Sequence, residues 1–120
     1  MEPYTMSTLP LSDFIASLSE NPCQVTFEHS IKIIEQHYIF TPTEFNNGQV
    51  INLAGQNNGS CKIFAFAQRH QLNLSQTLNL FGEFYHQDVL LKPEGDDHQN
   101  IRNFIKFGWQ GIAFKSISET

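Results

Sequence analysis

The segment "AGQNNGSCK", residues 54–62, gathers the residue types that suit a ligand-binding loop. Its two glycines let the backbone turn tightly and let a ligand approach closely. Ser60, Cys61 and Lys62 follow at the point where an apolar run predicts the start of a helix. The first amides of a helix lack internal partners and carry partial positive charge, so a phosphate or carboxylate group would suit this place. We therefore predict an anion-binding site made by the loop residues Gly55, Asn57, Asn58, Gly59, Ser60 and Lys62.

The same position allows a second reading, in which Cys61 is a nucleophile. The helix N-terminus and the neighbouring Lys62 would lower the pKa of a thiol in the first turn. A nucleophile also needs a base, and the histidines that folding could bring near are His37, His70, His86 and His98. In the plainer alternative, Ser60 or Asn58 caps the helix and the cysteine packs as a small hydrophobic residue. Cys61 and His98 are the catalytic candidates if the protein is an enzyme.

A second polar segment, "EGDDHQNIR" (residues 94–102), gives the patch Asp96, Asp97, His98 and Arg102. Carboxylates and an imidazole are metal ligands, but their spacing matches no metal-site signature. Asp96 followed three residues later by Gln99 also fits a capping box at the start of a helix. We therefore predict a ligand-contacting patch with no resident metal or cofactor. It would complete the site of residues 54–62 if folding brings the two together.

Apolar periodicity indicates which elements position these residues. It predicts helices from Leu11 to Leu18, after Thr26 to Tyr38, from Ser60 to His70, after Ser75 to Tyr85, and through Ile101, Phe104 and Ile105. "TPTE" (41–44) resembles a capping box, so we predict a one-turn helix closed by Gly48 and then a short extended segment, rather than a full hairpin. "GIAFKSI" fits a terminal strand or an extended tail. The expected fold is mainly α, a compact single domain over residues 1–120 with about five short helices, minor extended segments, and residues 1–10 as a loose N-terminal arm.

Composition excludes several classes of protein. The net charge is −5 and no basic stripe is visible, so we expect neither a nucleic-acid partner nor docking on an anionic membrane. No apolar run approaches the length of a membrane span. Only three residues separate Gly55 from Gly59, where a P-loop needs four, which disfavours a nucleotide triphosphatase. The two cysteines, Cys23 and Cys61, lie far apart in the sequence and suit reduced thiols in a cytosol.

Several stretches together resemble the HopJ type III effector family. They are "HYIFTPTEFNNG" (37–48), "AGQNNGSCKIFAFA" (54–67), "FGEFYHQDVL" (81–90) and "DDHQNIRNFIKFGWQGIAF" from residue 96 onward. The resemblance implies a small soluble bacterial protein of the cytoplasm, passed into a host cell by a type III secretion system. It brings no established activity and no active-site residues. The implied function is therefore a binding or interaction module for a protein or a small anionic ligand, and the alternative is a cysteine-dependent enzyme using Cys61.

Overall fold

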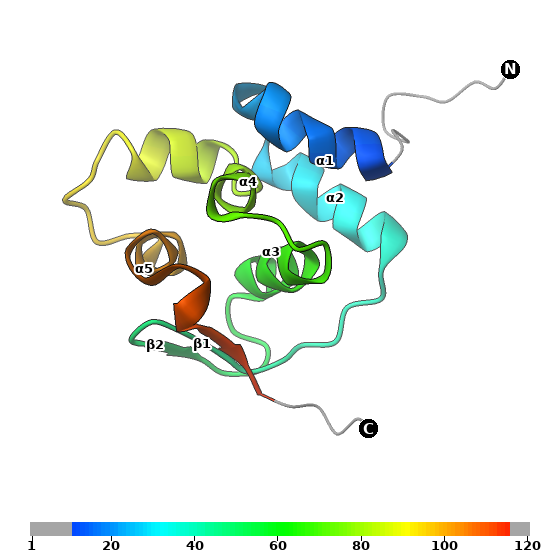
Figure 1. Cartoon of the computed structure of the whole chain (residues 1–120). Coiled ribbons are helices and arrows are strands. Elements are labelled where there is room, and N and C mark those ends of the chain that lie inside the picture. Colours follow the sequence, from blue (N-terminus) through cyan, green and yellow to red (C-terminus); the bar gives the residue numbers. More distant parts are fainter. Residues whose placement is uncertain (1–10, 116–120) are drawn as a thin grey trace, which may run out of the picture.

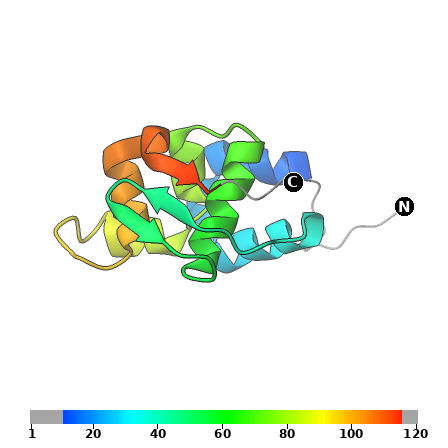
Figure 2. The same cartoon turned by 90° about the horizontal axis from the view of Figure 1, so that it is seen from below.

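The computed structural model describes residues 11–115, in which five α-helices pack with a small antiparallel sheet (Figures 1 and 2). The helices are α1 (Leu11–Glu20), α2 (Phe27–His37), α3 (Asn58–Arg69), α4 (Leu74–Asn79) and α5 (Gln99–Phe107). Shorter turns are the 3₁₀ segments η2 (Pro22–Gln24) and η4 (Gly108–Gly111) and the π-helical segment η3 (Phe84–Val89). The strands are β1 (Phe45–Asn47), β2 (Val50–Asn52) and β3 (Ile112–Phe114). The expected N-terminal arm, residues 1–10, lies outside the described residues.

Helix α3 lies at the centre of the molecule (Figure 1). Phe64, at its middle, is fully buried and contacts rings from the surrounding elements. Its ring centroid lies 5.9 Å from that of Phe45 in β1, 5.5 Å from Phe81 and 5.0 Å from Phe104 in α5. Offset and edge-on ring contacts of this kind add to the burial of apolar surface. The phenylalanine-rich core therefore fixes the sheet and α5 against α3.

The predicted start of α2 is confirmed, because the hydroxyl of Thr26 accepts a hydrogen bond from the amide of His29. The prediction for the next helix was wrong in two respects. Helix α4 is capped by Asn73, in a capping box with Gln76, and not by Ser75. It also ends at Asn79, so the predicted helix through Tyr85 is interrupted.

Gly82 explains the interruption. Its φ of +59° does not belong to a right-handed helix. A Cβ added at this residue would lie 2.5 Å from the backbone nitrogen of Phe27, so the start of α2 passes directly against it. The carboxylate of Glu83 then accepts a hydrogen bond from that same nitrogen at 3.0 Å. Tertiary packing therefore ends the helix where side-chain periodicity alone would continue it.

The one-turn helix predicted after Thr41 is wrong, because the chain forms a β-hairpin. β1 pairs antiparallel with β2, Asn47 opposite Val50, around the two-residue loop Gly48-Gln49. A positive φ at the first loop residue, +62° at Gly48, is the pattern of a type II′ hairpin turn. β1 also pairs with β3 on its other edge, giving the strand order β2-β1-β3. Pairing on both edges holds β1 extended, which outweighs the local capping signal of "TPTE".

Of the terminal strand and the extended tail that the sequence allowed after Gly111, the chain forms the strand, and β3 (Ile112–Phe114) completes the sheet. The sheet lies below α3 and α5 in Figure 1, and Figure 2 views the molecule from that side. Just before β3, Trp109 packs edge-on against Phe104 and donates its indole N–H to the carbonyl of Leu72 at 3.0 Å. Among residues 11–115, no helix has the length and apolar character needed to cross a membrane.

Candidate functional site

The N-termini of α3 and α5 meet at one cavity of about 360 Å³. Asn57, Gly59 and Ser60 line it from the loop singled out in the sequence, and His98 lines it from the second polar segment. Apolar side chains and residues from the first turn of α5 complete the lining: Phe27, Val50, Phe81, Phe84, Gln99, Asn100 and Ile101. The fold therefore brings together the two segments that the sequence marked separately.

Helix α3 begins without a side-chain cap. Its N-cap residue, Asn57, has left-handed backbone angles (φ 53°, ψ 48°), and no cap hydrogen bond comes from its side chain. That side chain instead donates from Nδ2 to Oδ1 of Asn52 at 2.7 Å. The expectation that Asn58 or Ser60 caps this helix was wrong. The first amides of a helix have no partners within the helix, and two residues of this first turn, Gly59 and Ser60, line the cavity.

Helix α5 begins in the same way. His98 is its N-cap, with φ 49° and ψ 50°, and provides no side-chain cap. The capping box predicted from Asp96 is therefore wrong. Gln99 still reaches back, but its Nε2 donates to the backbone carbonyl of Asp96 at 2.6 Å. Two helix N-termini, each without a side-chain cap, thus line the same cavity, and each contributes partial positive charge.

A buried asparagine network holds the two helix starts in place. Asn100, in the first turn of α5, is the hub of the network. Its Oδ1 accepts from Nδ2 of Asn47 at 2.9 Å and from Nδ2 of Asn52 at 3.1 Å. Its own Nδ2 donates to Oδ1 of Asn52 at 3.0 Å, the same oxygen that Asn57 contacts. The network therefore links α5, the hairpin and the N-cap of α3, through the buried side chains of Asn47, Asn52 and Asn100 and the exposed residue Asn57.

Sequence reasoning did not assign Asn47 or Asn52 to the site. Asn47 and Asn52 fall in short strands, where a polar residue normally faces solvent. The density of asparagine between residues 46 and 58 was the available signal. The asparagine density alone does not show that these side chains form a network, because the hairpin that places them opposite the start of α5 is seen only in the structure.

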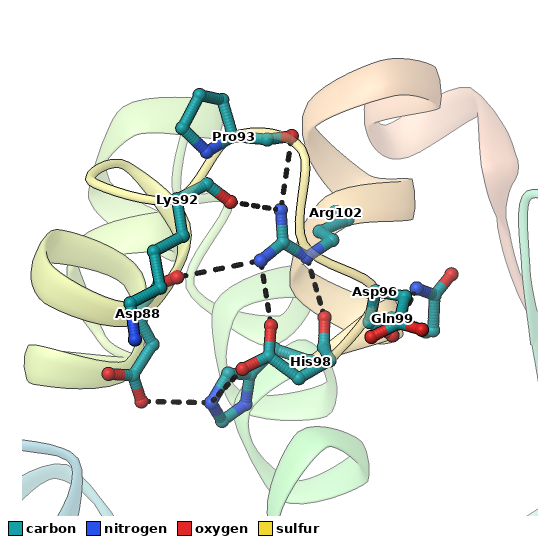
Figure 3. A network of polar contacts seen from close by, with 8 residues as sticks. Asp88, Lys92, Pro93, Asp96, His98, Gln99 and Arg102 are labelled. Atoms are coloured by element: carbon teal, nitrogen blue, oxygen red, sulfur yellow. Dashed lines mark hydrogen bonds and ion pairs between the residues drawn. The ribbon is translucent and has the colours of Figure 1, made fainter.

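Arg102 organises the segment before α5, as Figure 3 shows. Its guanidinium donates to the carboxylate of Asp97 at 2.7 Å and to the carbonyls of Asp97 and Lys92 at 2.6 and 2.9 Å. The hydrogen bond from Arg102 is the main cause that holds the pKa of Asp97 below its usual value. The N–H groups of Arg102 are therefore engaged by the segment just before α5 and are not offered to the cavity. Arg102, Asp97 and Asp96 do not line the cavity.

His98 is the member of that second patch which reaches the cavity. Its Nε2 lies 3.0 Å from a carboxylate oxygen of Asp88 (Figure 3). Its ring stacks on Phe84, with centroids 5.0 Å apart. The imidazole is thereby fixed at the edge of the cavity. Across residues 11–115 no three histidine, cysteine or acidic side chains converge to hold a metal ion.

Three other predicted residues lie away from this cavity. Lys62 turns to the opposite side of α3, where its Nζ is 2.7 Å from a carboxylate oxygen of Glu35 and 5.1 Å from the ring centre of Phe40. Gly55 and Asn58 also do not line the cavity. Within the described chain, no lysine or arginine lines it, so positive charge there comes from the helix ends and from His98 when it is protonated.

Cys61 has the wrong environment for an activated nucleophile. Its side chain is buried, and its Sγ donates to the carbonyl of Thr43 at 3.5 Å. Burial raises the pKa of the Cys61 thiol, contrary to the lowering predicted from its place in the first turn of α3. It lines a second cavity, on the side of α3 that Lys62 faces, and no histidine of residues 11–115 lines that cavity. His98 lines the other one, so the structure does not pair the two catalytic candidates.

Comparison with known proteins agrees with the resemblance noted in the sequence. A solved structure described as that of a protein of unknown function, VPA0580, shares 49% sequence identity with this chain. It superposes with a TM-score of 0.87, and the alignment covers 90% of each chain. No curated protein sequence matches significantly. The family model of the HopJ type III effector proteins matches residues 11–118, nearly the whole sequence. The chain therefore belongs to the HopJ type III effector family.

Proposed function

We propose that this protein acts by binding, and that its ligand is a small anion held between the N-termini of α3 and α5. The observation that carries the proposal is the convergence of two helix starts, neither with a side-chain cap, on one cavity. Helix N-termini attract phosphate and carboxylate groups through their free amides and their dipoles. Two such ends facing one cavity combine their effects on the same bound group.

The cavity suits a compact ligand with one anionic group and a small apolar body. Its volume of about 360 Å³ is at the lower end of the range for small-molecule sites. Phe27, Phe81 and Phe84 provide an apolar wall, while the hydroxyl of Ser60 and the imidazole of His98 offer polar contacts. Since no lysine or arginine of the described chain lines it, a highly charged ligand such as a nucleoside triphosphate would be poorly neutralised.

The cysteine-dependent enzyme is the weaker alternative. A thiolate nucleophile needs a low pKa and a nearby base. The thiol of Cys61 is buried with a raised pKa, in a cavity lined by no histidine of residues 11–115. A binding module needs neither property.

Membership of the HopJ family supports a biological setting for this binding activity. We propose a small protein made in the bacterial cytoplasm and exported to a host cell by a type III secretion system. Its partner there would be a host protein or a small anionic metabolite, and the proposal involves neither nucleic acid nor a membrane.

An NMR titration tests the binding proposal. Phenyl phosphate, added to ¹⁵N-labelled protein, should shift the amide signals of the first turns of α3 and α5, residues 58–60 and 99–101, in a saturable way. Benzyl alcohol, which has a similar ring without the anion, should leave these amides unshifted. Equal shifts with both compounds, or shifts with phenyl phosphate that avoid both helix starts, would contradict the proposal.

A further inference from the structure

A second, larger cavity of about 640 Å³ lies on the opposite side of α3. It is bounded by the extended segment 38–43, by the outer face of α3 and by the end of β3. The cavity described above is lined from the first turn of α3 by Gly59 and Ser60, whereas this one is lined by Cys61, Lys62 and the later turns. We call it the α3 groove.

The α3 groove is mainly apolar. Its lining includes four large apolar residues, Ile34, Phe40, Phe66 and Phe114, and the small residue Ala65 on α3. Ile39 also lines it, and this residue is 99% exposed. A large aliphatic side chain left wholly in water beside an apolar groove favours a ligand that covers both.

The charge at the groove is opposite to that of the whole protein. The chain has 12 acidic and seven basic residues, yet three of the bases, Lys62, Arg69 and Lys115, line the groove. No aspartate or glutamate of residues 11–115 lines it. An excess of positive charge gathered at an apolar surface of an acidic protein indicates an anionic ligand.

These three bases differ in how far they are already neutralised. Lys62 is 2.7 Å from a carboxylate oxygen of Glu35, and Lys115 is a looser 3.9 Å from Glu44. Arg69 lies over the ring of Tyr38, 5.1 Å from its centre, and pairs with no carboxylate among residues 11–115. The guanidinium of Arg69 is therefore the group best able to meet a ligand's negative charge, and its planar fork suits a carboxylate.

We propose that the α3 groove binds a small amphipathic anion, with an apolar chain along Phe40, Phe66 and Phe114 and an anionic head at Arg69. The volume is that of an ordinary small-molecule site. The site is independent of the cavity between the helix starts, because the two share no lining residue.

Two ligands of equal chain length and opposite charge test the charge preference. Octanoate, below its micelle concentration, should bind with saturable shifts of amides in α3 and in segment 38–43 in an NMR titration of the full chain. Octylammonium should bind at least about tenfold more weakly, because its head group would meet the guanidinium of Arg69, which pairs with no carboxylate among residues 11–115. Vesicles containing phosphatidylglycerol should not bind, which separates a free amphiphile from a lipid surface. Equal affinity for the two octyl compounds, or binding to vesicles alone, would overturn the proposal.

A near-isosteric pair of variants tests the location. Gln68 is exposed and lines the groove beside Arg69, so Gln68→Glu adds a negative charge there with little change of shape. We expect it to weaken octanoate binding at least about threefold. Gln87→Glu makes the same change on an exposed residue of η3, outside the groove, and should leave the affinity as it is. The same effect from both variants would overturn the assignment.

A third variant blocks the groove without touching its charges. Ala65 is exposed on α3, so a tryptophan at this position should be accommodated at the surface and should fill the groove. Ala65→Trp should abolish octanoate binding while the thermal midpoint stays near that of the parent protein. Unchanged affinity in a folded Ala65→Trp protein would show that the ligand sits elsewhere.

Discussion

Replacing Asn100 by alanine tests the network that positions the two helix starts. The substitution removes both polar atoms of a side chain that is 7% exposed and lies at the first turn of α5. Three hydrogen bonds to Asn47 and Asn52 are lost, at 2.9, 3.1 and 3.0 Å. The hairpin then keeps the hydrogen bond from Asn47 to the backbone carbonyl of residue 100 but loses its side-chain to side-chain bonds with α5. Both stability and the geometry of the cavity therefore depend on this residue.

The expected loss of stability depends on which hydrogen bonds Asn47 and Asn52 keep in the variant. Nδ2 of Asn47 still donates to the backbone carbonyl of residue 100 at 2.7 Å, and Oδ1 of Asn52 still accepts from Asn57 at 2.7 Å. Nδ2 of Asn52 retains only a 3.5 Å contact with the carbonyl of Phe45. One buried donor left almost unpaired costs about 1–3 kcal/mol, and each net hydrogen bond lost adds about 0.5–1.5 kcal/mol. We expect Asn100→Ala to lower the free energy of unfolding by about 3 kcal/mol.

Urea unfolding, followed by the fluorescence of the single tryptophan, Trp109, measures this loss. Asn103→Ala is the matched control, because it makes the same change one turn later in α5. Among residues 11–115, the side chain of Asn103 makes one local hydrogen bond, from Nδ2 to the carbonyl of Gln99, so this variant should change the stability by no more than about 0.5 kcal/mol. A loss below about 1 kcal/mol for Asn100→Ala, or equal losses for both variants, would refute the role given to the network.

Three further predictions address packing, pH and reactivity. Gly82→Ala should lower the free energy of unfolding, measured in urea, by about 2 kcal/mol more than Gly55→Ala, because both positions have a positive φ but only the Cβ at 82 would meet backbone atoms. Equal losses would contradict the close approach of the start of α2 to Gly82. Burial, with help from Arg69 and His37, lowers the pKa of His70, whose Nε2 is 2.6 Å from the hydroxyl of Tyr38. The contribution of His70 to stability is therefore complete above about pH 6.5, the ordinary pKa of histidine. It is lost as the pH falls from there through the lower pKa that His70 has in the folded protein. The urea midpoint should fall between pH 7 and pH 5 by less in His70→Gln than in the parent, and parallel pH profiles would count against this reasoning. Iodoacetamide should modify the exposed Cys23 in the native protein but reach the buried Cys61 only when the protein unfolds; rapid native alkylation of Cys61 in a Cys23→Ser background would revive the enzyme alternative.

The sequence predicted the elements whose pattern is local. The periodic apolar residues of α1, α2 and α3 marked those helices, and Thr26 marked the start of α2. The errors fell where distant segments decide the local conformation. The hairpin forms because β3, far along the chain, pairs with the other edge of β1. Helix α4 ends early because the backbone of α2 occupies the space beside Gly82.

The sequence marked two polar segments as candidates for the site, but not the hydrogen bonds that connect them in the folded chain. Both polar segments were identifiable from residue types, and the structure brings Ser60 and His98 to one cavity. The pKa of Cys61 is raised and not lowered as predicted, because the surrounding core buries a thiol that local sequence places at a helix start. Asn52 and Asn100 belong to the site through a network that exists only in the folded chain.

The most direct test of the central claim is the affinity for phenyl phosphate of two variants at Ser60. This residue lies in the first turn of α3 and lines the cavity, where Ser60→Glu would put a carboxylate among the helix amides and Ser60→Gln a neutral group of the same size. A glutamate at this turn is favourable for the helix, so both variants should fold. We predict that Ser60→Gln binds phenyl phosphate within a few-fold of the parent protein and that Ser60→Glu loses at least about tenfold. Equal affinities in the two variants would contradict an anion held between the starts of α3 and α5.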